Sequence, residues 1–223
     1  MVRTPASVDA PSSIDAPQAV RRLCPLASMT DAMVNPSGIL CRKMAKKMTH
    51  PSQSETMKPG SAVVSCVEGS RPLLVEIQAL VSRTHFGAPR RLATGVDPQR
   101  LALLSAVLEK RLGVNLWDQD IYLNVVGGLE VAEPAADLAI VAAILSSLFN
   151  KPIMGSTVVF GEVGLGGEIR PTMFTELRLK EALMLGFTRA VTPVHNGALE
   201  LRNHTIEILT ARNLQEAQPA LFG

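Results

Sequence analysis

The feature that most constrains this sequence is a long apolar stretch from residue 135 to about residue 148. Pro134 precedes it, which suits the first position of a helix. A helix formed from this stretch is apolar nearly all round, so it has no polar face to turn towards water. No apolar run in the chain reaches the roughly 18–20 residues that a membrane-spanning helix needs. We therefore predict a buried helix at the centre of a globular domain.

The segments around this helix predict strands and helices in an irregular order. Residues 61–67 and 73–81 are β-rich runs separated by a turn-like break, which is typical of a hairpin. Residues 98–111 have a helical pattern, with Asp97 as the N-cap and Gly113 at the end. Further strands are predicted at 121–126, 158–160, 168–170, 190–192 and 206–209, and helices at 176–185 and 214–221, the last broken by Pro219. This order indicates an α+β fold rather than a regular alternation of strands and helices.

The first 58 residues differ in texture from the rest. Proline and serine are frequent there, apolar periodicity is weak, and eight Lys and Arg stand against four Asp and Glu. We expect a disordered or linker-like tail in residues 1–58 and a single domain in residues 59–223. The domain carries fourteen basic against sixteen acidic residues, so nucleic-acid binding by it must depend on a local patch. Three widely spaced cysteines predict free thiols in a reducing cytoplasm, with neither a disulfide framework nor a zinc site.

Three patterns that often carry chemistry have simpler interpretations here. The glycine-rich segment 161–167 lies between two predicted strands, and no helix follows directly to bind a phosphate, so it predicts a tight turn. The phosphate-binding pattern GxxxxGK[ST] does not occur in the sequence, and we predict no cofactor or metal. The acidic residues Glu130, Glu133 and Asp137 surround the start of the apolar helix. They suit its positive end better than they suit a catalytic pair of carboxylates.

A long, collinear series of segments resembles the C-terminal domain of the bacterial RadA/Sms DNA-repair family. The similarity covers residues 59–193, and its segments are 59–64, 68–81, 89–95, 100–104, 118–128, 133–139, 160–165, 178–182 and 185–187. The resemblance implies a domain similar to the Lon protease domain, with a fold of the ribosomal-protein-S5 domain-2 type. The family's zinc finger and RecA-like ATPase have no counterpart here. The chain is therefore either a fragment or truncated product of a longer protein, or a protein that stands alone.

The resemblance also implies which positions correspond to the serine–lysine dyad of Lon-type peptidases. The serine position matches Ala135, and a methyl group cannot attack a carbonyl. The lysine position matches Arg178, whose guanidinium stays protonated and cannot act as a general base. A shift of register would place Lys180 there instead, but Ala135 would still offer no nucleophile. We expect no peptidase activity, and we expect Arg178 to form an ion pair with Asp137 or Glu133.

The sequence leaves three functional hypotheses, of which the first two follow from the resemblance. The first is a non-proteolytic module of recombinational DNA repair that forms a scaffold, as a hexameric ring, and contacts branched or single-stranded DNA. Its expected location is the cytoplasm, without a membrane, and a RecA-type recombinase is a candidate partner. The second is an ATP-dependent serine peptidase of the Lon type, and an inactive gene fragment is a third reading. The candidate DNA-contacting residues are Arg83, Arg90, Arg91 and Arg170.

Overall fold

In the computed structural model, residues 58–69, 71–85, 87–195 and 206–223 are described. Their elements follow one another as β1 (Ser61–Glu68), β2 (Arg71–Arg83), β3 (Arg91–Thr94), α2 (Pro98–Leu112), β4 (Gln119–Val125), η1 (Pro134–Ala136), α3 (Asp137–Leu148), β5 (Thr157–Val159), β6 (Glu162–Val163), β7 (Ile169–Arg170), α4 (Thr175–Met184), β8 (Arg189–Pro193), β9 (Glu207–Ala211) and α5 (Leu214–Phe222). The predicted tail, with Cys24 and Cys41, lies outside the described residues apart from Lys58.

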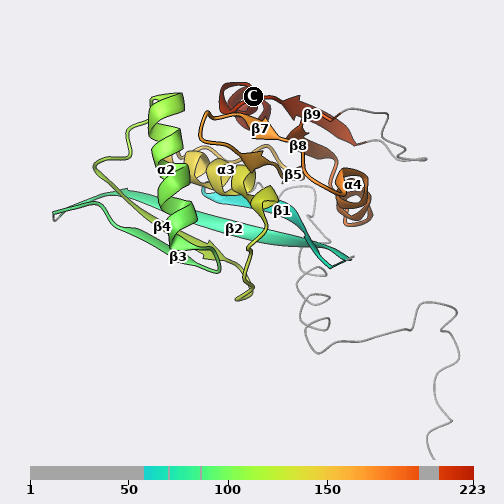
Figure 1. Ribbon diagram of the computed structural model, residues 1–223, viewed down its shortest axis with the longest axis horizontal. Coiled ribbons are helices and arrows are strands. Elements are labelled where there is room, and N and C mark those ends of the chain that lie inside the picture. Colours follow the sequence, from blue (N-terminus) through green and yellow to red (C-terminus); the bar gives the residue numbers. More distant parts are fainter. Residues whose placement is uncertain (1–57, 70, 86, 196–205) are drawn as a thin grey trace, which may run out of the picture. The chain divides into compact units, whose positions relative to one another are not determined.

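The strands form one seven-stranded sheet and one small hairpin (Figure 1). The sheet has the order β3-β4-β2-β1-β5-β8-β9. The predicted hairpin of β1 and β2 is confirmed: the pair is antiparallel, and Ser61 lies opposite Gln78. Beyond β1 the neighbouring strands β5, β8 and β9 run parallel. This mixed architecture agrees with the α+β class.

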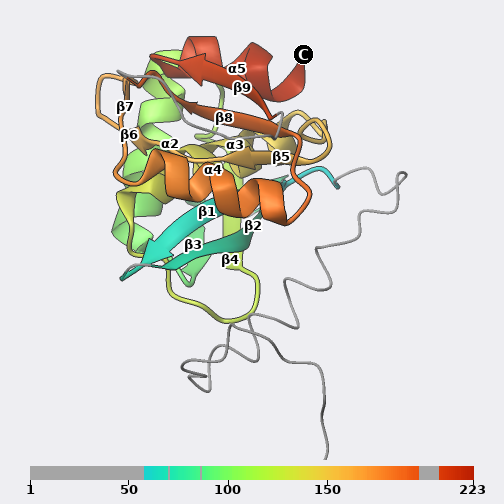
Figure 2. The ribbon, with the colours of Figure 1, turned by 90° about the vertical axis from the view of Figure 1, so that its right-hand side faces the viewer.

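The predicted central helix is the core of the domain. Ten of the twelve residues of α3 are buried, and the helix packs against β1 and β2. α4 also packs against β1 and β2 (Figure 2), and residues Ser61–Cys66 of β1 are buried on both sides of the strand. Among the described residues, no helix is long and apolar enough to cross a bilayer. The burial of α3 therefore takes place inside the protein, as its sequence predicts.

The predicted ends of α2 are confirmed in detail. The Asp97 side chain accepts a hydrogen bond from the Gln99 amide at 3.0 Å, and Gly113 ends the helix in the left-handed conformation, with φ of 66°. The prediction that Pro219 breaks the last helix is wrong. α5 continues through Pro219, because the Asn213 side chain caps its first turn and Leu214, Ala217, Leu221 and Phe222 bury one face.

The glycine-rich segment forms the tight turn that joins β6 and β7. Gly167 has φ of 82°, which explains one glycine by its backbone conformation. Gly164 and Gly166 have another reason: the Glu168 carboxylate lies where a Cβ atom on either residue would be. The turn therefore needs glycine in order to accommodate its own glutamate.

Candidate functional site

The two predicted dyad positions lie in the region between β1, η1 and α4. Ala135 is the middle residue of η1, and it is buried. Its carbonyl oxygen accepts a hydrogen bond from the Gly161 amide at 2.8 Å, so the backbone of η1 is tied to the segment after β5. The side chain is a methyl group, which offers no nucleophile at this position.

Arg178 lies in the middle of α4, and its side chain is fully buried, with 0% exposure. Its guanidinium forms an ion pair with the Glu133 carboxylate: Nη1 donates to Oε2 at 3.2 Å, and Nη2 donates to Oε1. Glu133 also accepts a hydrogen bond from the Val67 amide at 2.9 Å. Of the two partners that the sequence left open for Arg178, the structure selects Glu133.

The remaining contacts of Arg178 satisfy backbone groups. Nε donates to the Met173 carbonyl at 3.0 Å, and Nη1 donates to the Ser65 carbonyl. The guanidinium also lies over the Phe160 ring, with Cζ 5.7 Å from the ring centre. Each guanidinium nitrogen therefore has an acceptor, so a charge that would be costly to bury alone is paired and hydrogen-bonded.

Cys66 carries a thiol, which is a group that can act as a nucleophile in place of a serine hydroxyl. It is buried in β1, and burial raises the pKa of its thiol to about 12, with the negative charge of Glu133 adding to the rise. The thiol is therefore protonated at neutral pH and is a poor nucleophile. Within the described ranges, no group of three or more His, Cys, Asp or Glu side chains is arranged to hold a metal ion.

Asp137 is buried and forms a second ion pair, with the partly exposed Arg100 of α2. The Asp137 carboxylate accepts from Arg100 Nε at 2.7 Å and from Nη2, and also from the Val163 amide at 3.1 Å. Burial raises the pKa of the Asp137 carboxyl, and the Arg100 guanidinium opposes that rise. Sequence reasoning missed Arg100. The one feature that could have pointed to Arg100 is its position in the predicted helix of residues 98–111, next to the buried Leu101.

The three acidic residues at the start of α3 are therefore not a carboxylate pair. Asp137 lies in the first turn of α3, as the interaction with the positive helix end predicts. Glu133 instead turns towards α4, and Glu130 is exposed. Two arginines from different helices hold the buried carboxylate of Asp137 and the partly buried carboxylate of Glu133.

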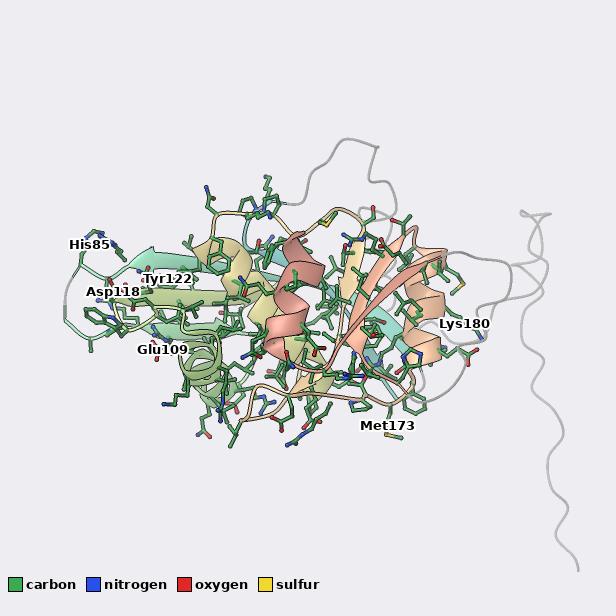
Figure 3. The ribbon with its side chains drawn as sticks, turned by 90° about the horizontal axis from the view of Figure 1, so that it is seen from above. His85, Glu109, Asp118, Tyr122, Met173 and Lys180 are labelled. Atoms are coloured by element: carbon green, nitrogen blue, oxygen red, sulfur yellow. The ribbon has the colours of Figure 1, made fainter. Side chains whose placement is uncertain are left out.

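The candidate DNA-contacting arginines divide into two groups. Arg83 ends β2 opposite Gln119, and Arg90 and Arg91 lie beside Asp120 and Ile121, so three of them gather around the start of β4. Figure 3 shows His85, Asp118 and Tyr122 at this same end of the sheet. Arg170 lies apart from them, on β7.

Their contacts separate them further. Arg83 and Arg90 have exposed side chains. The Arg91 guanidinium donates to the Gln119 and Leu116 carbonyls, so it fastens β3 to the loop before β4. Arg170 forms ion pairs with Glu162 at 3.2 Å and Glu168 at 2.6 Å. Arg83 and Arg90 are therefore better placed than Arg91 and Arg170 to contact an anion.

Comparison with known proteins gives several close relatives. A protein named DNA repair protein RadA from Pseudomonas aeruginosa is 44% identical over 196 residues, which is 85% of this chain and 43% of that protein. Proteins of the same name from Bacillus subtilis and Escherichia coli are each 49% identical, over 74% and 65% of this chain and 36% and 32% of their own lengths. The chain thus spans less than half of the relatives it matches. No protein-family model matches it.

Proposed function

We propose that this chain is the C-terminal, Lon-like domain of a RadA-type protein of recombinational DNA repair, with the S5-like fold that this resemblance implies. The domain serves as a non-proteolytic scaffold in a ring of identical copies and contacts DNA through a local basic patch. Similarity to three proteins named DNA repair protein RadA, at 44–49% identity, supports the repair role. In this proposal the RecA-like motor belongs to a companion segment or protein, and a RecA-type recombinase is a candidate partner.

One observation carries the non-proteolytic part of this proposal. The position of the peptidase lysine holds Arg178, whose guanidinium is fixed by Glu133 and by two backbone carbonyls. A general base needs a lone pair and a proton to take, and a buried arginine in an ion pair offers no lone pair. Ala135 supplies no nucleophile, so neither member of a dyad is available.

We expect the full chain to hydrolyse neither a fluorogenic peptide nor unfolded casein above the rate of a heat-denatured sample. The Ala135→Ser variant is expected to remain inactive, because a serine there still lacks a base to accept its proton. Steady-state fluorescence with and without ATP is the measurement. Hydrolysis that scales with enzyme concentration and is lost in a Cys66→Ala variant would reveal a replacement nucleophile and refute the proposal.

The DNA-contacting part of the proposal is assigned to Arg83 and Arg90. Both side chains are exposed and lie at one end of the sheet, where β2 ends and β3 begins. Asp118 and Asp120 lie near them, so the patch is small and its attraction for a polyanion is local. The domain as a whole carries no excess of positive charge.

We expect the Arg83→Ala/Arg90→Ala double variant to bind DNA more weakly and with a smaller salt dependence. Each lost phosphate contact lowers the slope of log K against log salt by about 0.9 on duplex DNA, so two contacts lower it by about 1.8. Fluorescence anisotropy over a salt series, with branched and single-stranded DNA, gives both quantities. The control is Arg71→Ala/Arg212→Ala, which removes the same charge at other exposed positions. An equal loss in both variants would point to non-specific attraction and remove the assignment.

A further inference from the structure

The loop between α2 and β4 carries the one tryptophan of the chain, and it carries it on the surface. Trp117 is 72% exposed, although an indole ring is among the largest apolar groups that a protein can bury. It lies two residues before Gln119, the first residue of β4. A tryptophan this exposed contributes little to the core, so its ring is available to a ligand.

The backbone on both sides of Trp117 is held in place. The Arg91 guanidinium donates to the Leu116 carbonyl at 2.7 Å and to the Gln119 carbonyl, so it spans the tryptophan. The amide of Thr84, just beyond β2, donates to the carbonyl of the residue after Trp117 at 2.8 Å. A ring on a fixed backbone loses little conformational freedom when a ligand stacks on it.

The same contacts place the tryptophan beside the two exposed arginines to which the DNA contact is assigned. Arg83 lies opposite Gln119 in the pairing of β2 with β4, two residues along the chain from Trp117. Arg90 directly precedes Arg91, whose side chain reaches the tryptophan loop. A strand whose phosphates contact these arginines can therefore present a base to the indole ring.

The charges at this end of the domain explain why the arginines alone make a weak site. Glu109 and Asp118 lie at the same end (Figure 3), and the Asp120 carboxylate accepts from the Arg90 amide at 2.8 Å. Three carboxylates thus offset the positive charge, so the attraction for phosphates is small. Stacking of a base on an aromatic ring adds affinity that does not depend on this charge balance.

We propose that Trp117 stacks on an unpaired base of single-stranded DNA whose neighbouring phosphates contact Arg83 and Arg90. Every base has a π-face, so this contact is independent of sequence. In a duplex the faces of paired bases are covered by the neighbouring pairs, which leaves only the phosphate contacts. The inference rests on the DNA contact proposed for the two arginines and adds the group that favours unpaired bases over duplex DNA.

The first experiment uses the tryptophan as its own probe. Trp117 is the one tryptophan of the full chain, so tryptophan fluorescence reports on this site directly. An oligothymidine of about ten nucleotides should quench the emission along a saturating curve. The matched ligand is an abasic strand of the same length, which has the same phosphates but no bases and should leave the emission nearly unchanged when anisotropy shows it bound. Equal quenching by the two bound strands would overturn the proposal.

The second experiment measures affinity by anisotropy with labelled strands. Trp117→Ala should weaken binding of oligothymidine about 5- to 100-fold, the range expected for loss of one base–aromatic stack, and should leave binding of the abasic strand unchanged. Trp117→Phe keeps an aromatic ring and should retain most of the affinity. The control is Leu165→Ala, which removes an apolar side chain that is 66% exposed between β6 and β7 and should change neither affinity. The substituted side chains are exposed, so circular dichroism should show unchanged melting temperatures.

The outcomes distinguish this inference from the DNA contact on which it rests. An unmodified chain that binds neither strand refutes both the contact and the stacking. Equal affinity of the unmodified chain for the two strands, or an equal loss for both strands in Trp117→Ala, refutes the stacking and leaves the phosphate contact. A loss in Trp117→Ala that is confined to oligothymidine, together with a loss for both strands in Arg83→Ala/Arg90→Ala, supports both.

Discussion

Replacing Arg178 by alanine is expected to lower the free energy of unfolding by roughly 3–5 kcal/mol, as removal of one partner of a buried ion pair generally does. The Glu133 carboxylate loses its counter-charge, and the Ser65 and Met173 carbonyls lose their donors. The truncation also leaves a cavity where the longest fully buried side chain of the described residues packs against Phe160. Denaturant unfolding followed by circular dichroism measures the loss, and the melting temperature should fall by about 10 °C.

The control for this prediction is Arg170→Ala. Arg170 also pairs with carboxylates, those of Glu162 and Glu168, but more than half of its side chain is exposed. Exposed ion pairs contribute up to about 1 kcal/mol, so the control should change stability little. If Arg178→Ala and Arg170→Ala have the same effect, the buried pair does not stabilise the fold as described.

The second large effect is expected from Asp137→Ala, at about 3 kcal/mol. The substitution removes the counter-charge of Arg100 and leaves the buried Val163 amide without its acceptor. Arg100 and Glu133 are exposed to a similar extent, but Asp137 has a much shorter side chain than Arg178, so its truncation leaves a smaller cavity and the loss is smaller. Asp137→Asn keeps an acceptor but removes the charge, so its loss of stability should be smaller than that of Asp137→Ala.

Glu207→Ala is the matched control for Asp137→Ala. Glu207 accepts from Arg189 Nε at 2.7 Å, but its side chain is largely exposed. Its removal should cost less than about 1 kcal/mol. A double-mutant cycle with Arg100→Ala isolates the pairing energy of Asp137, and a coupling near zero would contradict the role given to this pair.

Local features of the fold were predictable because local chemistry determines them. The cap of α2 at Asp97, its end at Gly113 and the burial of α3 all follow from residues within a few positions of one another. The continuation of α5 through Pro219 was not predictable in this way. The Asn213 cap is local, but packing of α5 against β8 and β9 outweighs the effect of Pro219, and this packing is not visible in the pattern of the helix itself. The strand order depends likewise on contacts between segments separated by dozens of residues.

The candidate site was likewise predictable only in part. The similarity to a known family identified Ala135 and Arg178, but it left Asp137 and Glu133 as equal candidates for the ion pair. The choice depends on where α2 places Arg100, because this arginine takes Asp137 and leaves Glu133 for Arg178. The sequence pattern gives no direct sign that Arg100 of α2 pairs with Asp137 and so leaves Glu133 for Arg178 of α4.

The network around Arg178 has a consequence for how the chain can evolve. A lysine at this position has a single nitrogen and cannot reach Glu133 and both carbonyls with the planar geometry that a guanidinium provides. Replacement of Arg178 by lysine is therefore expected to destabilise the domain. Selection for stability alone is thus expected to keep an arginine at position 178.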